Sequence, residues 1–540
     1  MIGLLTLSLG LAHAEAPSVD SMYLVMVDRF HSGRTANDGD VDPDDPSAFH
    51  GGDLAGLMAK LDTIEALGVD TLWLTPIGHM REERIAEHGA FHGYWPDNNR
   101  RVAPRFGTRS DLLALREALE ARGMKLILDA VLNHVGPETG LTQAHPDWFH
   151  SNGDITDWAD PEQLRNNDVH GLPDLDQSHP EVVRHLVADG HFWLRAARPD
   201  GFRVDAVRHI DPSFLKTWIS KMSAKSTSPL IFAGEVFDGN PVAVATEVKA
   251  TGLTHSFDFP LYYALTESIC SDGDLRKIAA VLTQDRNYPA GHHWITFLDN
   301  HDTARVQTVC GEHTEAAFTL MTSLRGIPAF TWGTEAGFTG KTEAEARSSM
   351  RFDDLPHQGW IARLLDDRRA YTPLISGATD LLSSKPDQLV VARVMSHDAV
   401  IITVDTPTKP VLPKEAGSVQ WNPITEEGRV RRWLITPEPG QSFEAWLSRI
   451  ETEQGETASV RVEIPSTERL SGSDPAVGAW NTAAAIGPGP VEVDLPVGGV
   501  VALKTLKQEE DGTIVWSKQP DHFVDVDKAV VKDEPIRLGR

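Results

Sequence analysis

The chain has 540 residues, of which 41% are hydrophobic, so it is long enough for two to four domains with buried cores. Its formal net charge of -28 argues against nucleic acid or an anionic membrane as a partner, because both are negatively charged and would repel it. A neutral polymer would not be repelled.

The first residues have the pattern of an export signal. Met1 to Leu11 is the only long apolar stretch, and it is too short to span a bilayer. It is followed by Ala12-His13-Ala14, which is typical of a signal cleavage site. The sequence therefore predicts a signal peptide over residues 1–14 and a secreted, extracellular protein.

Eight short apolar runs follow between residues 23 and 335, separated by segments of helical periodicity. One such segment, residues 53–67, is expected to be a single helix, and another, residues 110–122, is expected to be capped by Ser110 and Asp111. Alternating strands and helices predict an α/β protein, a TIM-type (β/α)8 barrel over residues 15–375. The runs are YLVMVDRF from residue 23, TLWLTPI from 71, KLILDAV from 125, GFRVDAV from 201, LIFAGEV from 230, LTHSFDF from 253, HWITFLD from 293 and GIPAFTWGTE from 326.

The rest of the chain divides by composition. A long insertion at about 135–177 follows the third strand, and such loops in barrels are usually functional. Short strand-like runs with Pro and Gly between them predict an all-β domain over 376–455 and a β-sandwich over 456–528. The charged residues beyond Asp525 are expected to be loose, with a tail at 529–540.

Three carboxylates stand where predicted strands end. Asp205 and Arg203 are two residues apart, so they point to one face, and the guanidinium would keep Asp205 ionised. Glu235 has apolar neighbours, which favour the protonated form. Asp302 follows the seventh strand. Two carboxyl groups about 5 Å apart can break a glycosidic bond with retention of configuration.

The segments DAVLNH, GFRVDAVRH, GEVF and FLDNHD, from residues 129, 201, 234 and 297, resemble in order and spacing the four signature regions of the alpha-amylase family, glycoside hydrolase family 13. The resemblance implies that Asp205 is the nucleophile, that Glu235 is the acid and base, and that Asp302 stabilises the charged sugar. It also marks the insertion as the family's domain B.

The same resemblance implies a set of substrate-binding residues. His134 and His301 match residues that hydrogen-bond the sugar at the cleavage site. HGYWPDN from residue 92 is similar to the family segment in which Tyr94 would stack on a sugar ring, with Trp95 beside it. Arg208 and His209 stand on the acceptor side, where the family commonly has Lys-His, and the Arg changes the hydrogen-bond geometry.

Calcium is the cofactor that the resemblance implies. Asn133, Asp174 and the backbone carbonyl of His209 match three ligands of the ion that ties domain B to the barrel, although Asn133 and Asp174 could also be loop caps. A second calcium, as in cyclodextrin glucanotransferases, is suggested by Asn37, Asp38, Gly51 and Asp53. Ser32 and Arg34 stand where that pattern has ligands, so a solvated acidic loop remains the alternative.

Trp480, Lys504 and Trp516 in the last domain resemble the starch-binding domain of carbohydrate-binding module family 20. Two exposed tryptophans could stack on adjacent glucose rings, and the alternative is that they are buried in the sandwich core. Cys270 and Cys310 are the only cysteines, and we expect two buried thiols rather than a bridge, because nothing in the intervening sequence fixes the pair's geometry.

These patterns together favour a monomeric, secreted, calcium-binding alpha-amylase that cleaves alpha-1,4 bonds inside starch and related alpha-glucans. A cyclodextrin glucanotransferase is the first alternative, but that class has an aromatic residue shortly before the position of Asp174, where this chain has Val169-His170-Gly171. A non-catalytic starch-binding protein is the second. It would be expected to lack one of the three acids, and none is missing.

Overall fold

The computed structural model describes residues 18–81, 83–85, 88–406, 408–426, 428–509, 511–526 and 535–538. The signal peptide predicted for residues 1–14 lies outside these ranges. Within them, no helix combines the length and the apolar character needed to cross a membrane.

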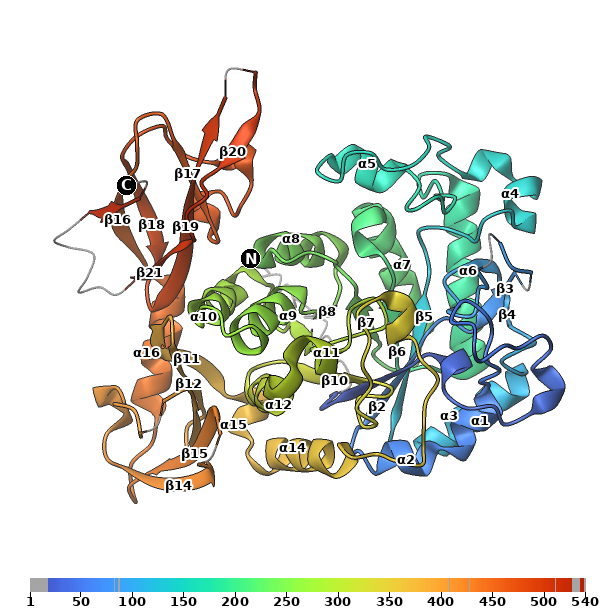
Figure 1. Ribbon diagram of the computed structural model, residues 1–540, viewed down its shortest axis with the longest axis horizontal. Helices are drawn as coiled ribbons and strands as arrows, with labels where there is room; N and C mark the ends of the chain where they lie inside the picture. The colour runs from blue at the N-terminus through green and yellow to red at the C-terminus, as the bar shows by residue number, and fades with distance from the viewer. Residues whose placement is uncertain are drawn as a thin grey trace, which may run out of the picture.

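The centre of the molecule is a closed barrel of eight parallel strands, which confirms the predicted fold class (Figure 1). Each of the eight apolar runs supplies one strand. Neighbouring strands are consecutive along the chain, except that β1 closes the barrel against the last one. The barrel strands are β1 Met22–Val25, β2 Thr71–Leu74, β5 Lys125–Ala130, β6 Gly201–Val204, β7 Ile231–Gly234, β8 His255–Phe257, β9 His293–Thr296 and β10 Ile327–Thr331.

Helices surround the barrel and bury their apolar faces against it. In α3, Leu112, Leu115 and Leu119 are fully buried, as the helical spacing predicts. The helices of this part are α1 Leu54–Ala59, α2 Leu61–Glu65, α3 Arg109–Glu120, α6 Pro180–Ala197, α7 Pro212–Lys225, α8 Pro241–Thr251, α9 Phe259–Leu265, α10 Arg276–Thr283, α11 Val306–Cys310, α12 Thr314–Ser323, α13 Glu343–Ala346, α14 Gln358–Ala370 and α15 Pro373–Ser376, with a π-helical turn η5 Thr266–Cys270 and a 3-10 turn η4 Val207–His209.

Two helix expectations need correction. The helix expected over 53–67 breaks at Lys60, whose backbone leaves the helical region, and so forms α1 and α2. The cap of α3 is Thr108 rather than Ser110. Thr108 accepts a hydrogen bond from the backbone N–H of Asp111 and the Asp111 carboxylate accepts one from the backbone N–H of Thr108, which is a complete capping box.

The insertion after β5 contains the short helices α4 Gly140–Ala144 and α5 Pro161–Asn166 and a few isolated β-bridges. One bridge pairs His134 with Asp174, so the two ends of the insertion meet directly above β5. A hairpin of β3 Gly78–Met80 and β4 Pro96–Val102 adjoins it after β2.

Two β units follow the barrel. The first is an antiparallel sheet in the order β11-β12-β13-β15-β14, covered by α16, a helix that the sequence did not reveal and that buries Trp446 and Ile450 against the sheet. Its elements are β11 Ala378–Lys385, β12 Gln388–Val394, β13 Ala399–Val404, β14 Val419–Thr425, β15 Val430–Pro437 and α16 Glu444–Gly455.

The second unit packs two sheets around a small apolar core. Its strands are β16 Thr457–Glu463, β17 Arg469–Gly472, β18 Val491–Pro496, β19 Gly499–Gln508, β20 Ile514–Trp516, β21 His522–Val526 and β22 Ile536–Arg537. The segment that was expected to be a loose tail therefore contributes a strand, since β22 pairs in parallel with β16. Figure 1 shows this unit and domain B on opposite sides of the barrel.

The expectation of two free thiols is wrong. Cys270 and Cys310 form a disulfide with their Cα atoms 4.1 Å apart. Cys270 ends η5 and Cys310 ends α11, and these two ends pack together. The pairing follows from this tertiary contact, which no local pattern encodes.

Candidate active site

A single buried guanidinium organises the catalytic acids. Arg203 Nη1 lies 2.5 Å from Asp205 Oδ1, and Arg203 Nη2 lies 2.7 Å from Glu235 Oε1. Arg203 also donates to Asp129, its register partner on β5, at 3.0 Å. Asp205 and Glu235 therefore share one side chain at the carboxyl ends of β6 and β7, on the same rim of the barrel.

A left-handed residue brings Glu235 to this point. Ala206, directly after Asp205, has a φ of 49°, which is unfavourable for a residue with a Cβ. In this conformation its N–H donates to Glu235 Oε2 at 2.9 Å, and the next N–H, that of Val207, donates to the Glu235 carbonyl at 3.0 Å. The backbone that carries one acid thus holds the other.

The two acids differ in their surroundings. Burial raises the pKa of Glu235 to about 8, and the charges of Asp205 and Asp302 act in the same direction against the opposing effect of Arg203. At neutral pH Glu235 is therefore protonated and able to donate. Asp205 lies at the same guanidinium with 11% of its side chain exposed, and it differs from Glu235 in its hydrogen-bond partners.

Asp302 lies on the loop after β9, with 30% of its side chain exposed. Burial alone would raise its pKa, but His301 and the guanidinium of Arg347 lower it below the usual value. Arg347 Nη2 is 2.7 Å from Asp302 Oδ1, and His301 Nε2 is 3.1 Å from Oδ2. Asp302 is thus an oriented, ionised carboxylate. Sequence reasoning missed Arg347, which directly follows the short helix α13 as its C-cap residue.

Tyr94 forms an aromatic wall with His301, the two rings being stacked 5.2 Å apart and 10° from parallel. Its hydroxyl donates to Asp129 at 2.8 Å, and His134 donates to its carbonyl at 3.1 Å. Trp95 is half-buried, and its ring meets His92 edge to face at 5.2 Å. The structure thus brings Tyr94, His134 and His301 together around Arg203.

The acceptor-side pair lies on η4. Arg208 donates to the carbonyl of Phe237 at 3.1 Å, and His209 Nδ1 donates to the carbonyl of Leu164 at 2.7 Å. An aromatic residue that the sequence did not single out stands above them. Trp158 of domain B is 47% exposed, with its ring 5.5 Å from that of His170 and 6.0 Å from that of His209. In the sequence, only the position of Trp158 as a large aromatic residue among polar ones could have indicated a binding role.

Two buried oxygens fit a cation. Asn133 Oδ1 and Asp174 Oδ1 have no hydrogen-bond partner, and both residues are fully buried. Burial raises the pKa of Asp174 to about 7 although His150 donates to its other oxygen at 2.5 Å. Unpartnered oxygens in so dry a place are costly unless a ligand satisfies them. Side-chain oxygens of this kind are ligands that Ca²⁺ prefers.

The residues of the suggested second site also leave two buried oxygens without a partner, Asn37 Oδ1 and Asp53 Oδ2. Asp53 Oδ1 caps α1 through the N–H of Gly56 at 2.6 Å. Asp38 Oδ1 accepts from Ser32 at 3.1 Å and lies against Gly51. Arg34 turns away from this group and pairs with Asp111 at 3.0 Å.

Trp480 and Trp516 lie side by side in the last β unit, with ring centroids 6.1 Å apart and planes inclined by 59°. Both rings are half-buried, and Trp480 also packs against the apolar core of the barrel. Lys504 is paired with Asp521 at 3.1 Å. The two rings therefore form a bent surface at the edge of the barrel.

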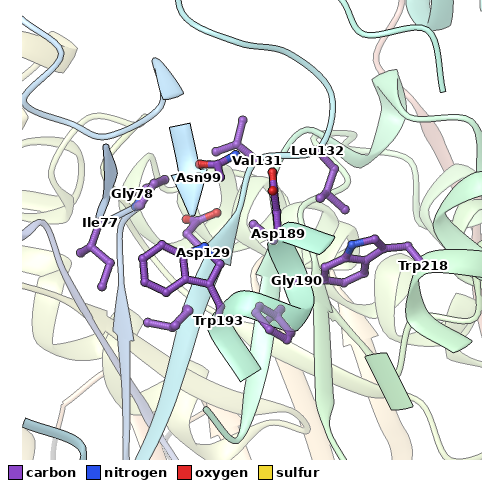
Figure 2. A pocket seen from close by; sticks show the side chains of 14 residues that line it. Ile77, Gly78, Asn99, Asp129, Val131, Leu132, Asp189, Gly190, Trp193 and Trp218 are labelled. Carbon is purple, nitrogen blue, oxygen red and sulfur yellow. The ribbon is translucent and has the colours of Figure 1, made fainter. Parts of the chain in front are cut away.

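A cavity of about 30 Å³ lies behind the catalytic acids, between β5 and α6. Figure 2 shows Asp129, Asp189 and Trp193 among the side chains that line it. The volume suits about one water molecule and not a sugar. This cavity is therefore not a sugar-binding site.

Comparison with known proteins agrees with this geometry. A family model described as "Alpha amylase, catalytic domain" matches residues 24–370. A beta/alpha-amylase of Paenibacillus polymyxa is 31% identical over 364 residues, which are 62% of this chain but only 29% of that protein. A cyclomaltodextrin glucanotransferase of Klebsiella oxytoca is 28% identical over 461 residues, covering 72% of this chain and 70% of that protein.

Among solved structures, an alpha-amylase from Geobacillus thermoleovorans complexed with acarbose is 26% identical, with a TM-score of 0.66 and coverage of 93% of this chain and 97% of that chain. The cyclomaltodextrin glucanotransferase CldA has the same TM-score at 21% identity, which shows a common fold alone.

Proposed function

Because the chain belongs to the alpha-amylase family of glycoside hydrolases, we propose that it hydrolyses alpha-1,4-glucosidic bonds within starch and related alpha-glucans, with retention of configuration. The observation that carries this proposal is the pair of carboxyl groups, Asp205 and Glu235, held on the one guanidinium of Arg203. Such closeness suits a double displacement rather than an inverting attack, which needs room for a water molecule between the two acids.

The chemistry follows from the protonation states. Asp205 attacks the anomeric carbon and forms a glycosyl ester, while Glu235 gives its proton to the departing sugar oxygen. Glu235, now ionised, takes a proton from water, and the resulting hydroxide oxygen displaces Asp205 from the sugar. Asp302 faces the positive charge that develops on the ring, and Tyr94 supplies an apolar wall beside it.

The test is reducing-sugar release from soluble starch. We expect Glu235→Gln and Asp205→Asn to lose activity by at least about a thousandfold, since each removes one half of the double displacement. Glu117→Gln makes the same chemical change on an exposed face of α3 and should leave activity intact. Equal rates for Glu235→Gln and the wild type would refute the assignment.

Transglycosylation is the second candidate, and one observation favours it. The exposed ring of Trp158 stands beside His170 and His209 on the acceptor side, where it could hold an incoming sugar and keep out water. If so, chromatography of the products should show longer or cyclic glucans from the wild type and a shift toward linear, short products from Trp158→Ala. Linear, short products from both proteins would leave hydrolysis as the only activity.

Calcium binding is part of the proposal. The unpartnered oxygens of Asn133 and Asp174, with the His209 carbonyl, would hold the ion and fasten domain B to the barrel. When bound, the ion supplies structural cross-linking and charge neutralisation. The orphaned oxygens of Asn37 and Asp53 support a second ion in the same way.

The remaining parts of the proposal concern starch attachment and secretion. The adjacent rings of Trp480 and Trp516 support binding of a glucan by the last β unit. Trp516→Ala should reduce sedimentation with starch granules and spare hydrolysis of soluble starch. The apolar stretch at residues 1–11 supports secretion, which N-terminal sequencing of the protein from culture medium would test.

A further inference from the structure

A second pocket lies on the outer wall of the barrel and contains none of the catalytic acids. Its volume is about 610 Å³. It is formed by residues 34–37 after β1, residues 100–104 at the end of β4, the start of α3 and Phe192 of α6. These elements lie together on the side of the barrel away from the two β units (Figure 1).

The pocket is strongly basic in an acidic protein. Four arginines line it, Arg34, Arg100, Arg101 and Arg109, whereas acidic residues outnumber basic ones by 78 to 50 in the whole chain. The start of α3 also faces the pocket, and Arg109 is the first residue of that helix. The capping box of Thr108 and Asp111 satisfies part of this helix end, so the positive charge of the pocket comes from the arginines.

Two of the arginines are held in place by acids. Arg34 makes a two-point contact with Asp111, at 3.0 and 3.2 Å. Arg100 is 2.7 Å from Asp189 and also contacts His185. These ion pairs hold the guanidinium groups of Arg34 and Arg100 in fixed orientations.

The other two arginines have no acidic partner. The side chain of Arg101 makes no hydrogen bond or ion pair with any residue in the described ranges. Arg109 donates only to the backbone carbonyl of Arg195, at 3.1 Å. Two guanidinium groups thus remain available beside two that are fixed.

The wall also has an apolar part, beside the polar side chains of Asn37 and Thr108. Val102, Pro104 and Phe192 line it, and the Phe192 ring is braced edge to face on Trp193 at 5.1 Å. An inorganic anion alone would leave this surface and most of the volume unused. A sugar ring suits it, because sugars stack on aromatic faces with their apolar C–H groups.

We propose that this pocket binds a phosphate monoester carried by a sugar, with the phosphate at the arginines and the ring against Phe192. Arginine forks match phosphate oxygens in pairs, which makes them the fitting residues for a dianion. The ester can come from two sources, a free sugar phosphate or a phosphate group on a glucan chain. The second source is geometrically open, because Tyr94 of the candidate active site comes shortly before β4, and the extended chain from there to Arg101 spans roughly 20 Å.

Titration calorimetry at low salt tests the binding. We expect glucose 6-phosphate to bind with a submillimolar Kd, inorganic phosphate to bind more weakly, and glucose to show no heat. Arg101→Glu combined with Arg109→Glu should weaken the binding of glucose 6-phosphate at least tenfold. Added NaCl should weaken the binding of glucose 6-phosphate to the wild type. Arg363→Glu combined with Lys221→Glu, an equal total charge change at exposed positions of α14 and α7, is the control.

Absence of saturable binding by glucose 6-phosphate, or equal binding by the pocket variant and the control, overturns the proposal. This arm does not involve hydrolysis, so it can succeed or fail independently of the proposed glycosidase activity.

The second arm identifies the source and rests on the proposed hydrolysis. Initial rates are compared on a phosphorylated dextrin and on the same dextrin after phosphatase treatment. A lower KM for the phosphorylated form, lost in the double variant, assigns the pocket to glucan phosphate. An unchanged KM together with tight glucose 6-phosphate binding assigns it to the free sugar phosphate.

Discussion

Arg203 explains how several acids coexist in one buried place. Three carboxyl groups, those of Asp129, Asp205 and Glu235, surround its guanidinium, and burial raises the pKa of Asp129 to about 7. The single positive charge cannot balance three negative ones. Protonation of Glu235 removes part of the excess, so the site selects one proton donor by electrostatics.

The first prediction concerns this geometry. Lysine in place of Arg203 keeps the charge but has a single side-chain nitrogen, so it cannot place one nitrogen against Asp205 and a second against Glu235 as the planar guanidinium does. We expect Arg203→Lys to lower kcat about a hundredfold, because small misplacements of reacting groups have effects of that size. Steady-state kinetics measure this, and thermal unfolding checks that the variant is folded. A folded variant with kcat within a few-fold of the wild type would contradict the role of Arg203.

The second prediction concerns pH. Activity requires protonated Glu235, so kcat/KM should fall as pH rises through about 8, the pKa of this carboxyl in the free enzyme. The negative charge of Asp302 contributes to that raised pKa. Asp302→Asn should therefore move the alkaline limb of its residual activity to lower pH. A limb that stays in place or moves upward would show that Asp302 does not act on Glu235 electrostatically.

At the scale of elements, the strands with their terminal acids could be predicted because each is a continuous apolar run with chemistry at its end. The contact between Arg203 and Asp205 follows from strand alternation alone. Arg347 and Trp158 could not be found this way. Trp158 lies in an irregular loop and Arg347 directly follows the four-residue helix α13, so their positions beside His209 and Asp302 depend on how these segments fold back.

The missed helix and the missed disulfide have similar causes. α16 has a modest apolar face, Trp446 and Ile450, in a region whose other segments read as strands. The bridge between Cys270 and Cys310 depends on the meeting of two helix ends. The apolar periodicity of the sequence continues through Lys60, but the helix breaks there. The local pattern therefore did not predict this break.

The third prediction concerns the proposed calcium ion between domain B and the barrel. If Asn133 and Asp174 hold Ca²⁺, the ion should raise Tm by binding only the folded state, and a chelator should reverse this. The Asp174 pKa of about 7 means that protons compete with the ion, so the stabilisation should shrink as pH falls below 7.

Asp174→Asn removes both the charge and the competing proton. It should abolish most of the calcium effect and its pH dependence. A Tm shift that is the same in the wild type and in Asp174→Asn would place the ion elsewhere.

At the scale of the whole molecule, the last β unit is joined to the rest by more than the chain. Only Glu456 separates α16 from β16, so no flexible linker intervenes. Three further contacts tie the unit to the barrel helices. Thr283 of α10 accepts from the N–H of Val500 at 2.8 Å, Asn240 at the start of α8 donates to the carbonyl of Ala479 at 2.6 Å, and Arg276 stacks on Phe523 at 4.7 Å.

These contacts give the glucan-binding proposal a spatial consequence. Asn240 follows Glu235 by only five positions, and Ala479 directly precedes Trp480. The loop that carries the catalytic acid therefore touches the turn that carries one of the two tryptophans. A glucan on Trp480 and Trp516 would be held at a fixed position relative to the catalytic rim rather than on a mobile module.

The fourth prediction tests this rigid attachment. Thr283→Val keeps the shape of the side chain but leaves the buried N–H of Val500 without an acceptor, which should cost about 1–3 kcal/mol. We expect faster hydrogen exchange in β19 and a lower Tm for the last β unit. Thr319→Val is the matched control, because Thr319 of α12 makes the same bond to its own helix backbone as Thr283 does and has no partner in another unit. If the two variants lose equal stability and β19 exchanges no faster in Thr283→Val, the hydrogen bond does not hold the unit to the barrel, and the fixed relation between Trp480 and Glu235 fails with it.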